Sequence, residues 1–287
     1  MFSTLLSGVI LGAVYTLAAI GLSLQWGVLR NLNFSHGACI TWGAYLMWTA
    51  MGAQLSYLPA FVVVMVAMFL VGMAIERTTI RPFFGKPEVE VNIFVATVAL
   101  SSIMAQVILL IFGGKDKNLE PAIEGVADLG ILKTTYHQLF ILLIAPLVLV
   151  AIWFILTRTK IGRAIRAVSQ DPLGAILIGI PTYEVYGVTV GVATVLAGIS
   201  GVLLGPIYFL NPHMGESPLT KAFFIVIVGG IGSLKGTIVA AFIVAILEVL
   251  VGLFAGVTWG PMAIFATMIG ILLFRPDGLF GAKLRRG

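Results

Sequence analysis

Cysteine, histidine and charged residues are all scarce in this chain of 287 residues, and each scarcity excludes a class of protein. Cys39 is the only cysteine, so no disulfide can form within the chain. The three histidines, His36, His137 and His213, lie far apart, and no Cys/His spacing typical of a metal site occurs. The same residues offer no convincing pair of nucleophile and base, so we expect neither a metal centre nor an enzyme.

Charge is low because the chain is mostly apolar. Only 10% of the residues are charged and 60% are hydrophobic, with a mean hydropathy of +1.09. A soluble domain carries about 25% charged residues and could not cover so much apolar surface. We therefore expect one all-α integral membrane domain over residues 1–287, surrounded by lipid. The net charge of +5 fits the Lys/Arg bias of cytoplasmic loops, so we expect no nucleic-acid partner.

Apolar runs of roughly 20 residues predict the membrane-spanning helices, because the core of a bilayer is about 30 Å thick. Nine segments are candidates, with two spans in residues 31–75 separated by a turn at 54–59: 4–29, 31–75, 91–114, 136–156, 183–204, 222–233, 236–253 and 259–274. The segment 222–233 is short for a complete span. The sequence therefore predicts a polytopic bundle of about eight or nine transmembrane helices.

The positions of lysine and arginine predict the orientation of the chain. Basic residues are concentrated in residues 76–90, 158–171 and 275–286, whereas acidic residues outnumber lysines in residues 115–133. We therefore place residues 115–133 and the N-terminus outside and the three basic segments inside, with a cytoplasmic C-terminus.

Two short polar segments, residues 31–37 and 211–215, interrupt the apolar runs. Each follows a similar glycine-containing segment, at 16–21 and 195–201, and the two would run through the membrane in opposite directions. This pattern predicts an inverted repeat whose broken or re-entrant helices meet near a solute route, although ordinary interfacial loops are compatible with it. The candidate residues for the route in these segments are Asn33, Ser35, His36, Gly37 and Asn211.

A few polar residues inside the predicted spans are further candidates for the solute route. Glu248 is the only clear acid in the middle of a span; it could line the route, bind an amine or pair with another helix. Thr97, Ser101 and Ser102 recur about one helical turn apart and can share a face. Since Ser and Thr also form hydrogen bonds within their own helix or with a neighbouring one, these residues could either line the route or have only a structural role. A route without fixed charge would suit a zwitterion or a neutral amide.

The segment of about 158–182 lies between two predicted spans on the basic side of the membrane. Asp171 and Pro172 predict the start of a short helix, since Asp can cap free amides and Pro fits the first turn. Arg163 and Arg166 are three residues apart and would share a helical face. The pattern is compatible with an amphipathic helix resting on lipid and with a helix that docks on a cytosolic partner.

Several motifs, which occur in the order and at the spacing of one permease family, extend over nearly the whole chain. They are residues 12–21, 33–37, 162–167, 179–180, 196–203, 229–236, 247–248 and 275–281. Together they make the chain similar to the LivH-like permeases of the branched-chain amino acid ABC importers. The chain departs from the family pattern at Ser35, where alanine is typical, and at Ala38, where an acid often follows the glycine.

The resemblance implies a permease of the bacterial inner membrane that pairs with a second, LivM-like permease, two cytosolic ATPases and a periplasmic solute-binding protein. ATP and Mg²⁺ would bind to the ATPases, so no cofactor is expected on this chain, which has no Gly-rich Lys-Ser/Thr phosphate loop. The solute would be a branched-chain or related amino acid, an amide or urea. The implied residues for coupling to the ATPases are Gly162, Arg163, Ala164, Arg166, Ala167, Asp171, Pro172, Ala175 and Gly179.

Three other functions are alternatives to an ABC importer permease. A passive channel for small neutral solutes is the main alternative, because aquaporin-like channels also have two polar breaks that open with Asn. The repeated Asn-Pro-Ala of those channels is absent here. A secondary transporter usually places ion-coupling acids in mid-membrane, where only Glu248 is available. A membrane enzyme would need a group of catalytic side chains, which this sequence does not offer.

Overall fold

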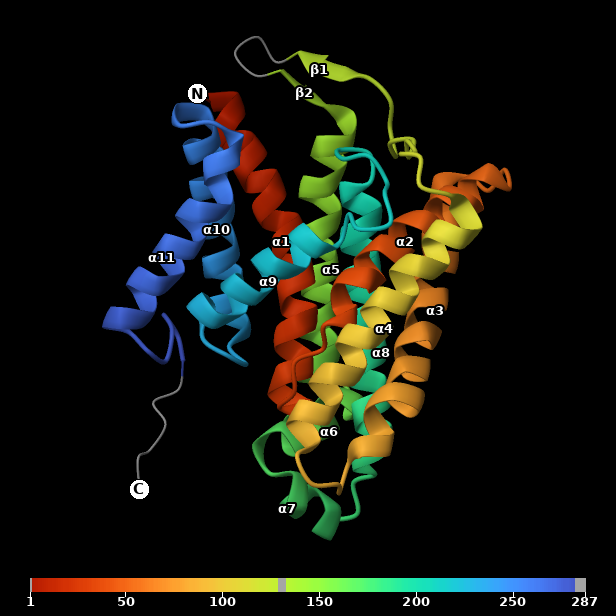
Figure 1. Ribbon diagram of the computed structural model, residues 1–287, viewed down its shortest axis with the longest axis vertical. Helices are drawn as coiled ribbons and strands as arrows, with labels where there is room; N and C mark the ends of the chain where they lie inside the picture. Colours follow the sequence, from red (N-terminus) through yellow and green to blue (C-terminus); the bar gives the residue numbers. More distant parts are fainter. Residues whose placement is uncertain (1, 129–132, 282–287) are drawn as a thin grey trace.

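The computed structural model describes residues 2–128 and 133–281 as a bundle of helices (Figure 1). The helices are α1 (Phe2–Leu29), α2 (Ser35–Gly52), α3 (Tyr57–Ile75), α4 (Val89–Phe112), α5 (Tyr136–Arg158), α6 (Lys160–Gln170), α7 (Pro172–Leu177), α8 (Thr182–Leu204), α9 (Glu216–Gly229), α10 (Leu234–Phe254) and α11 (Gly260–Phe274). A π-helical turn at Glu76–Ile80 and a 3₁₀ turn at Arg81–Phe83 extend α3, and a 3₁₀ turn at Val257–Trp259 precedes α11.

The two ends of the bundle differ in structure. Strands β1 (Val126–Asp128) and β2 (Lys133–Thr135) pair antiparallel at one end, which we call the hairpin end. Helices α6 and α7 lie at the opposite end, which we call the α7 end (Figure 1). The N-terminus of α1 lies at the hairpin end, and α11 runs from that end toward the α7 end.

Seven of the described helical segments are long and apolar enough to cross a membrane: α1, α3 with its extension, α4, α5, α8, α10, and α11 with its preceding turn. The expectation of eight or nine spans is therefore not confirmed. Helix α9 has 14 residues, which gives a length of about 21 Å at 1.5 Å per residue, too short for a bilayer core of about 30 Å. Helix α2 has 18 residues, and buried polar groups such as Ser35, His36 and Thr41 lower its apolar character.

Helices α1 and α8 pack against each other and run in opposite directions (Figure 1). Each leads into a polar break and then into one of the two shorter helices, so that α2 returns along α8 and α9 returns along α1. The bundle is therefore built from two similar units of opposite direction, which agrees with the inverted repeat predicted from residues 31–37 and 211–215.

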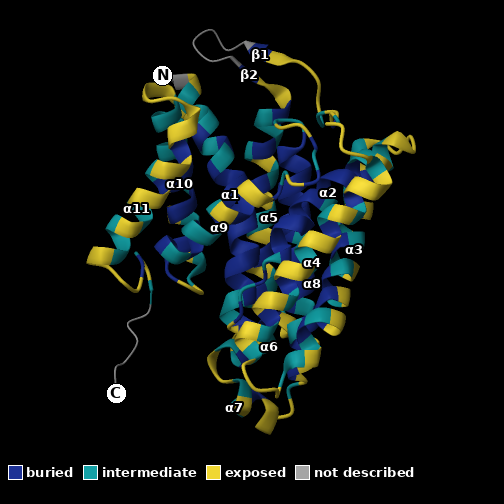
Figure 2. Ribbon diagram, viewed as in Figure 1, coloured by how far each residue is buried: buried dark blue, intermediate teal, exposed yellow. Residues whose placement is uncertain are grey.

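Small residues allow the helices of the core to approach closely. Figure 2 shows that α1, α2 and α8 are mostly buried, whereas α3, α4, α5 and α11 carry many exposed residues. A Cβ built on Gly12 of α1 would lie 2.7 Å from the ring of Phe242 in α10, and one built on Gly191 of α8 would lie 2.8 Å from the ring of Phe69 in α3. Glycines of α1 and α8 thus leave room for phenylalanine rings of α10 and α3, as expected of close packing between membrane helices.

Candidate functional site

The first polar break is a capped turn buried in the protein. The Oδ1 atom of Asn33 accepts hydrogen bonds from the backbone N–H of Ser35 at 3.0 Å and from its hydroxyl at 2.6 Å. The Nε2 atom of His36 donates to the carbonyl oxygen of Ala18 in α1 at 3.0 Å. Asn33, Ser35 and His36 are all at most 3% exposed. In this conformation His36 holds α2 against α1, and Asn33 and Ser35 fix the local turn of the chain that precedes α2.

The second break has the same turn. The Oδ1 atom of Asn211 accepts from the backbone N–H of His213 at 3.1 Å, with the two-residue spacing of Asn33 and Ser35. The backbone N–H of Gly215 donates to Thr41 Oγ1 in α2 at 3.0 Å, so the two breaks meet. The contact between the breaks is closed to larger side chains, because a Cβ on Gly37 would lie 2.9 Å from Leu219 Cβ.

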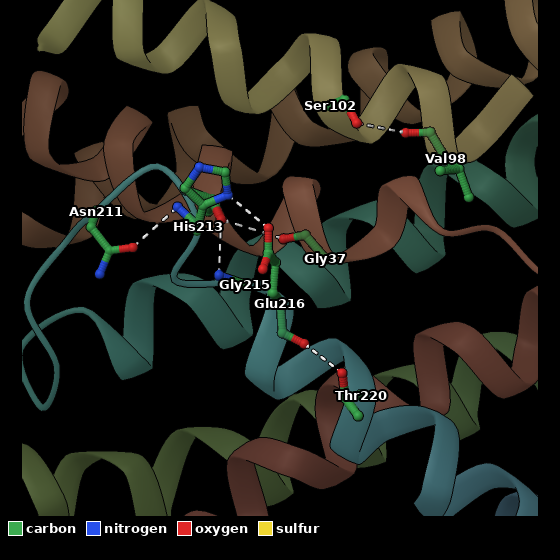
Figure 3. A network of polar contacts seen from close by, with 9 residues as sticks. Gly37, Val98, Ser102, Asn211, His213, Gly215, Glu216 and Thr220 are labelled. Carbon is green, nitrogen blue, oxygen red and sulfur yellow. Dashed lines mark hydrogen bonds and ion pairs between the residues drawn. The ribbon is translucent and has the colours of Figure 1, made fainter. Parts of the chain in front are cut away.

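Polar side chains of the second break and of the start of α9 form a row, which we call the α9 polar row: Asn211, His213, Glu216 and Thr220. Asn211 is half-buried, and the other three are exposed. Figure 3 shows these side chains at the start of α9, well apart from Ser102 on α4. The Nδ1 atom of His213 lies 2.7 Å from Glu216 Oε1, and the hydroxyl of Thr220 donates to the Glu216 carbonyl oxygen at 2.9 Å. Helix α9 begins below the hairpin-end termini of α1, α5 and α10 (Figure 1). Ionisable groups at that depth are costly against lipid, so this face requires water or a protein partner.

The predicted polar stripe on α4 is divided between buried and exposed positions. Thr97 is fully buried, and its Oγ1 accepts from the backbone N–H of Phe34 at 3.2 Å. Ser101 is half-buried, whereas Ser102 is exposed and its hydroxyl donates to the Val98 carbonyl oxygen of its own helix at 3.3 Å. Thr97 therefore ties α4 to the first break, and the two serines lie one turn closer to the hairpin end.

Three phenylalanines, which we call the aromatic cluster, join the first break to α4 and α9. The ring of Phe34 lies 4.9 Å from that of Phe94 in α4 and 4.8 Å from that of Phe223 in α9, measured between centroids. Phe94 precedes the polar residues of α4 and Phe223 follows those of α9, so on both helices the cluster lies closer to the α7 end. No feature of the sequence distinguished these three from the other phenylalanines, because apolar aromatic residues are common throughout the spans.

A cavity of about 840 Å³ opens on the α7 side of the aromatic cluster, and we call it the α6 cavity. Phe94 is part of the aromatic cluster and also lines the cavity, so the cluster forms one end of the cavity. Helix α6 contributes Ser169 and Gln170 to the wall, opposite residues from the end of α1 and the start of α4. A smaller cavity of about 290 Å³ beside it shares both α6 residues. The shape of the α6 cavity therefore depends on the position of α6.

Glu248 forms an ion pair between helices. Its Oε1 lies 2.6 Å from Lys221 Nζ of α9, and its Oε2 accepts from the hydroxyl of Tyr15 in α1 at 3.1 Å. Lys221 also donates to the Tyr15 oxygen at 2.8 Å. The side chains of Lys221 and Glu248 are 11% and 18% exposed. Lys221 was not predicted from the sequence, although a lone base in one apolar helix and a lone acid in another are the signal for such a pair.

A second ion pair, between Glu76 and Arg81, was also not predicted from the sequence. Glu76 is fully buried, and its two carboxylate oxygens accept from Arg81 at 3.0 and 2.9 Å. Arg81 also donates to the carbonyl oxygen of Tyr183 at 3.1 Å and so links the extension of α3 to α8. Residues five apart do not face each other on an α-helix, but the π-helical turn here has an i to i+5 repeat. From the sequence, residues 76–90 were expected to form only a basic loop.

The predicted coupling segment forms two helices that are joined closely to α5. Thr159 is the single residue between α5 and α6; its hydroxyl donates to the Ile155 carbonyl oxygen at 2.6 Å and accepts from the Gly162 N–H at 3.0 Å. Gly162 packs on the backbone of Ile155 and Leu156, where a Cβ has no room. The corner between α5 and α6 is thus fixed by hydrogen bonds and by close packing.

Helix α7 starts as predicted and exposes apolar side chains. The Oδ1 atom of Asp171 accepts from the Leu173 N–H at 3.1 Å, and Pro172 occupies the first turn. Leu173 is 74% exposed and Leu177 is 87% exposed, whereas Ala175 is buried. The remaining coupling candidates are exposed Arg163 and Arg166, half-buried Ala164 and Ala167, and Gly179, whose φ of +82° ends the segment. An exposed apolar surface of this kind indicates contact with lipid or with another protein.

Comparisons with known proteins give this arrangement a family. The family described as branched-chain amino acid transport system, permease component, matches residues 4–274. LivH, the permease of the high-affinity branched-chain amino acid transport system of Escherichia coli (strain K12), is 29% identical over 96% of this chain and 94% of its own length. BraD of Pseudomonas aeruginosa, from a system of the same description, is 27% identical over 96% of this chain and 94% of its own length.

A more distant relative transports a different solute. LsrC, the permease of the autoinducer 2 import system of Yersinia pseudotuberculosis, is 27% identical over 95% of this chain and 76% of its own length. No solved structure is significantly similar to the chain. The family match covers nearly all of the chain, and the described helices fit a multi-pass membrane protein. The chain belongs to the family of permease components of branched-chain amino acid transport systems.

Proposed function

We propose that the chain is the membrane-spanning permease of an ATP-driven ABC importer for branched-chain or related amino acids. The observation that carries the proposal is the exposed apolar surface of α7, formed by Leu173, Ile176, Leu177 and Ile178 beside two exposed arginines of α6. A passive channel needs no such surface outside its spans. A permease driven by a separate ATPase needs an exposed surface to which the ATPase binds.

The α7 end is the cytoplasmic end in this proposal. The basic segments 76–90 and 158–171 lie there, and α11 runs toward it (Figure 1). The Lys/Arg bias of cytoplasmic loops then supports a hairpin end on the periplasmic side of the bacterial inner membrane and a C-terminus in the cytoplasm. A periplasmic solute-binding protein would deliver the solute at the hairpin end.

Coupling follows from the connection of α7 to the α6 cavity. The apolar surface of α7 would insert into a groove of a cytosolic ATPase, with Arg163 and Arg166 supplying charge at its rim. Helix α6 carries Ser169 and Gln170 into the wall of the α6 cavity, so a displacement of α7 would change the cavity. ATP and Mg²⁺ would bind to the two ATPases, and this chain would hold no cofactor and catalyse no reaction.

The route would lie between this chain and a second, LivM-like permease. Ser102 and all of the α9 polar row except half-buried Asn211 are exposed on the single chain, and a partner that shares the route would remove them from lipid. The aromatic cluster would close the route in this conformation, between the polar row and the α6 cavity. The names of relatives support branched-chain amino acids as solutes, and related amino acids, amides and urea are the other candidates.

Reconstitution of the complete transporter tests this function. The chain would be purified with its partner permease and ATPases, placed in proteoliposomes with the binding protein, and assayed for uptake of leucine, isoleucine, valine, an amide and urea. The expected result is uptake that requires both ATP and the binding protein. Flux of a solute through this chain alone, without ATP, would instead indicate a channel.

Charge reversal at α6 tests the coupling surface. The double variant Arg163→Glu with Arg166→Glu is expected to lower ATP-driven uptake at least about tenfold, since repulsion of about 1.4 kcal/mol at the docking rim is a tenfold change in binding. Membrane insertion should be unchanged, because both side chains are exposed. The matched controls are the double Lys variant, which keeps the charge, and Arg77→Glu at the same end. Normal uptake by the double Glu variant would remove α6 from the docking surface.

A further inference from the structure

The α6 cavity has opposite charges at its rim. Arg30, at the end of α1, and Glu90, in the first turn of α4, both line it. In the described part of the chain neither side chain takes part in an ion pair. The apolar part of the wall includes Trp26 and Phe94, from α1 and α4. Figure 1 shows that these elements converge beside α6. A cation, an anion and an aromatic surface therefore share one cavity.

Asn31 also lines this cavity, and it carries a buried acceptor without a partner. Asn31 is only 8% exposed; its Nδ2 donates to the Leu29 carbonyl oxygen at 3.1 Å, but its Oδ1 is buried and has no hydrogen-bond partner. Leaving a buried acceptor unsatisfied costs about 1–3 kcal/mol. A donor from a bound molecule would satisfy it once the side chain turns this oxygen toward the cavity.

The backbone at Arg30 is in a left-handed conformation, with φ of 55°, while its N–H still donates to the Trp26 carbonyl oxygen at 2.9 Å. Glycine or asparagine usually occupies this position after a helix, and other residues are about 1–2 kcal/mol less favourable there. Residues held in such conformations are concentrated at functional sites. The conformation ends α1 with a cationic side chain at the rim of the cavity.

We propose that the α6 cavity binds the zwitterion of a free amino acid. The guanidinium of Arg30 pairs with the α-carboxylate, as guanidinium groups do in charge-assisted hydrogen bonds. The Glu90 carboxylate and Asn31 Oδ1 accept from the α-ammonium group, and Trp26 and Phe94 contact the apolar side chain. The volume of about 840 Å³ lies within the range of about 300–1,000 Å³ usual for small-molecule sites. The site rests on the proposed function, because it lies on the cytoplasmic side of the proposed route.

The proposed site would be the last one that the solute occupies before release. Since α6 forms part of its wall, occupancy and the position of α6 are linked. Amino acid that accumulates inside the vesicle would refill the site and slow further uptake. The exposed positions of Arg30 and Glu90 leave both charges partly solvated, so binding should be weak and rapidly reversible.

Binding of radiolabelled L-leucine to the purified transporter, without binding protein or ATP, tests the site directly. Saturable binding is expected, and unlabelled L-leucine should compete for it. Two analogues separate the two charges: leucinamide lacks the carboxylate, and 4-methylpentanoate lacks the ammonium group. Each is expected to compete at least about tenfold less well than leucine, the equivalent of about 1.4 kcal/mol for a lost charge-assisted contact.

Two variants test which residue contacts the carboxylate and which contacts the ammonium group of leucine. Arg30→Gln should weaken leucine binding and abolish the preference for leucine over leucinamide, whereas Glu90→Gln should abolish the preference over 4-methylpentanoate. The matched controls are Arg77→Gln and Glu88→Gln, exposed residues at the same end that do not line the cavity. Absence of saturable binding, or unchanged analogue preferences in both cavity variants, would overturn the site.

The outcomes separate the site from the proposed function. ATP-driven uptake by a transporter that shows no leucine binding would remove the site and leave the importer function in place. Specific leucine binding that both cavity variants disturb, in a transporter without any ATP-driven uptake, would support the site and contradict the importer function.

Discussion

The ion pair between Lys221 and Glu248 should stabilise the chain only as a pair. The structure joins the two side chains at 2.6 Å and adds the hydroxyl of Tyr15 to both. The exposed fractions of 11% and 18% leave little access for water. Lys221→Met would leave a carboxylate without its partner, and Glu248→Gln would leave an ammonium group without its partner. The double variant removes both charges at once.

The expected magnitudes follow from this burial. Loss of one partner of a buried pair costs about 3–5 kcal/mol, and the residual exposure places each single variant near 3 kcal/mol. The double variant removes both charges together and leaves no buried charge without a partner, so it should cost only about 1 kcal/mol, the value of a typical hydrogen bond. It should therefore be more stable than either single variant by about 2 kcal/mol. Tyr15→Phe, which removes only one hydroxyl, should cost about 1 kcal/mol and serves as the control.

The assay is the free energy of unfolding in mixed detergent micelles, measured for the wild-type chain and the variants, with uptake measured in parallel. Recovery of both stability and uptake in the double variant would show that the pair acts by holding α9 on α1 and α10. Recovery of stability without uptake would place Glu248 on the solute route. A double variant less stable than both single variants would refute the reasoning.

Three further substitutions test other contacts. Gly37→Leu should abolish uptake, because even a Cβ at this position lies 2.9 Å from Leu219 Cβ; uptake at the wild-type rate would show that the two breaks do not need to touch. Arg81→Leu should lower the free energy of unfolding by about 3 kcal/mol by leaving Glu76 buried and unpaired, and a melting temperature equal to that of the wild type would contradict this. Leu177→Asp should leave folding unchanged, because the side chain is 87% exposed, but should reduce co-purification of the ATPases; full co-purification would remove α7 from the docking surface.

The class of the fold could be predicted because it depends on local properties of the sequence. Apolar runs identify membrane helices from hydropathy alone, and the polar residues 31–37 and 211–215 stand out within them. The start of α7 could be predicted because Asp171 caps the helix by accepting a hydrogen bond from the Leu173 N–H, only two residues away. The number of spans could not, because the lengths of α2 and α9 depend on where each break lies in three dimensions.

Most contacts of the candidate site could not be predicted, because they join residues far apart in the chain. Phe34 meets Phe94 and Phe223 only after α2, α4 and α9 have packed together. His36 has the polarity expected of a route residue, but its ring faces the backbone of α1 and is fully buried. Polarity within a span therefore identifies residues with a specific role without distinguishing helix anchors from residues that face solute.

The corner at Thr159 has a mechanical consequence. With one residue between α5 and α6, and with that residue hydrogen-bonded to both helices, the corner restricts rotation of α6 relative to α5. We therefore expect a force applied to α6 to turn α5 with it. Helix α5 crosses the whole bundle to β2 (Figure 1), so an event at the α7 end would reach the opposite surface without passing through the aromatic cluster.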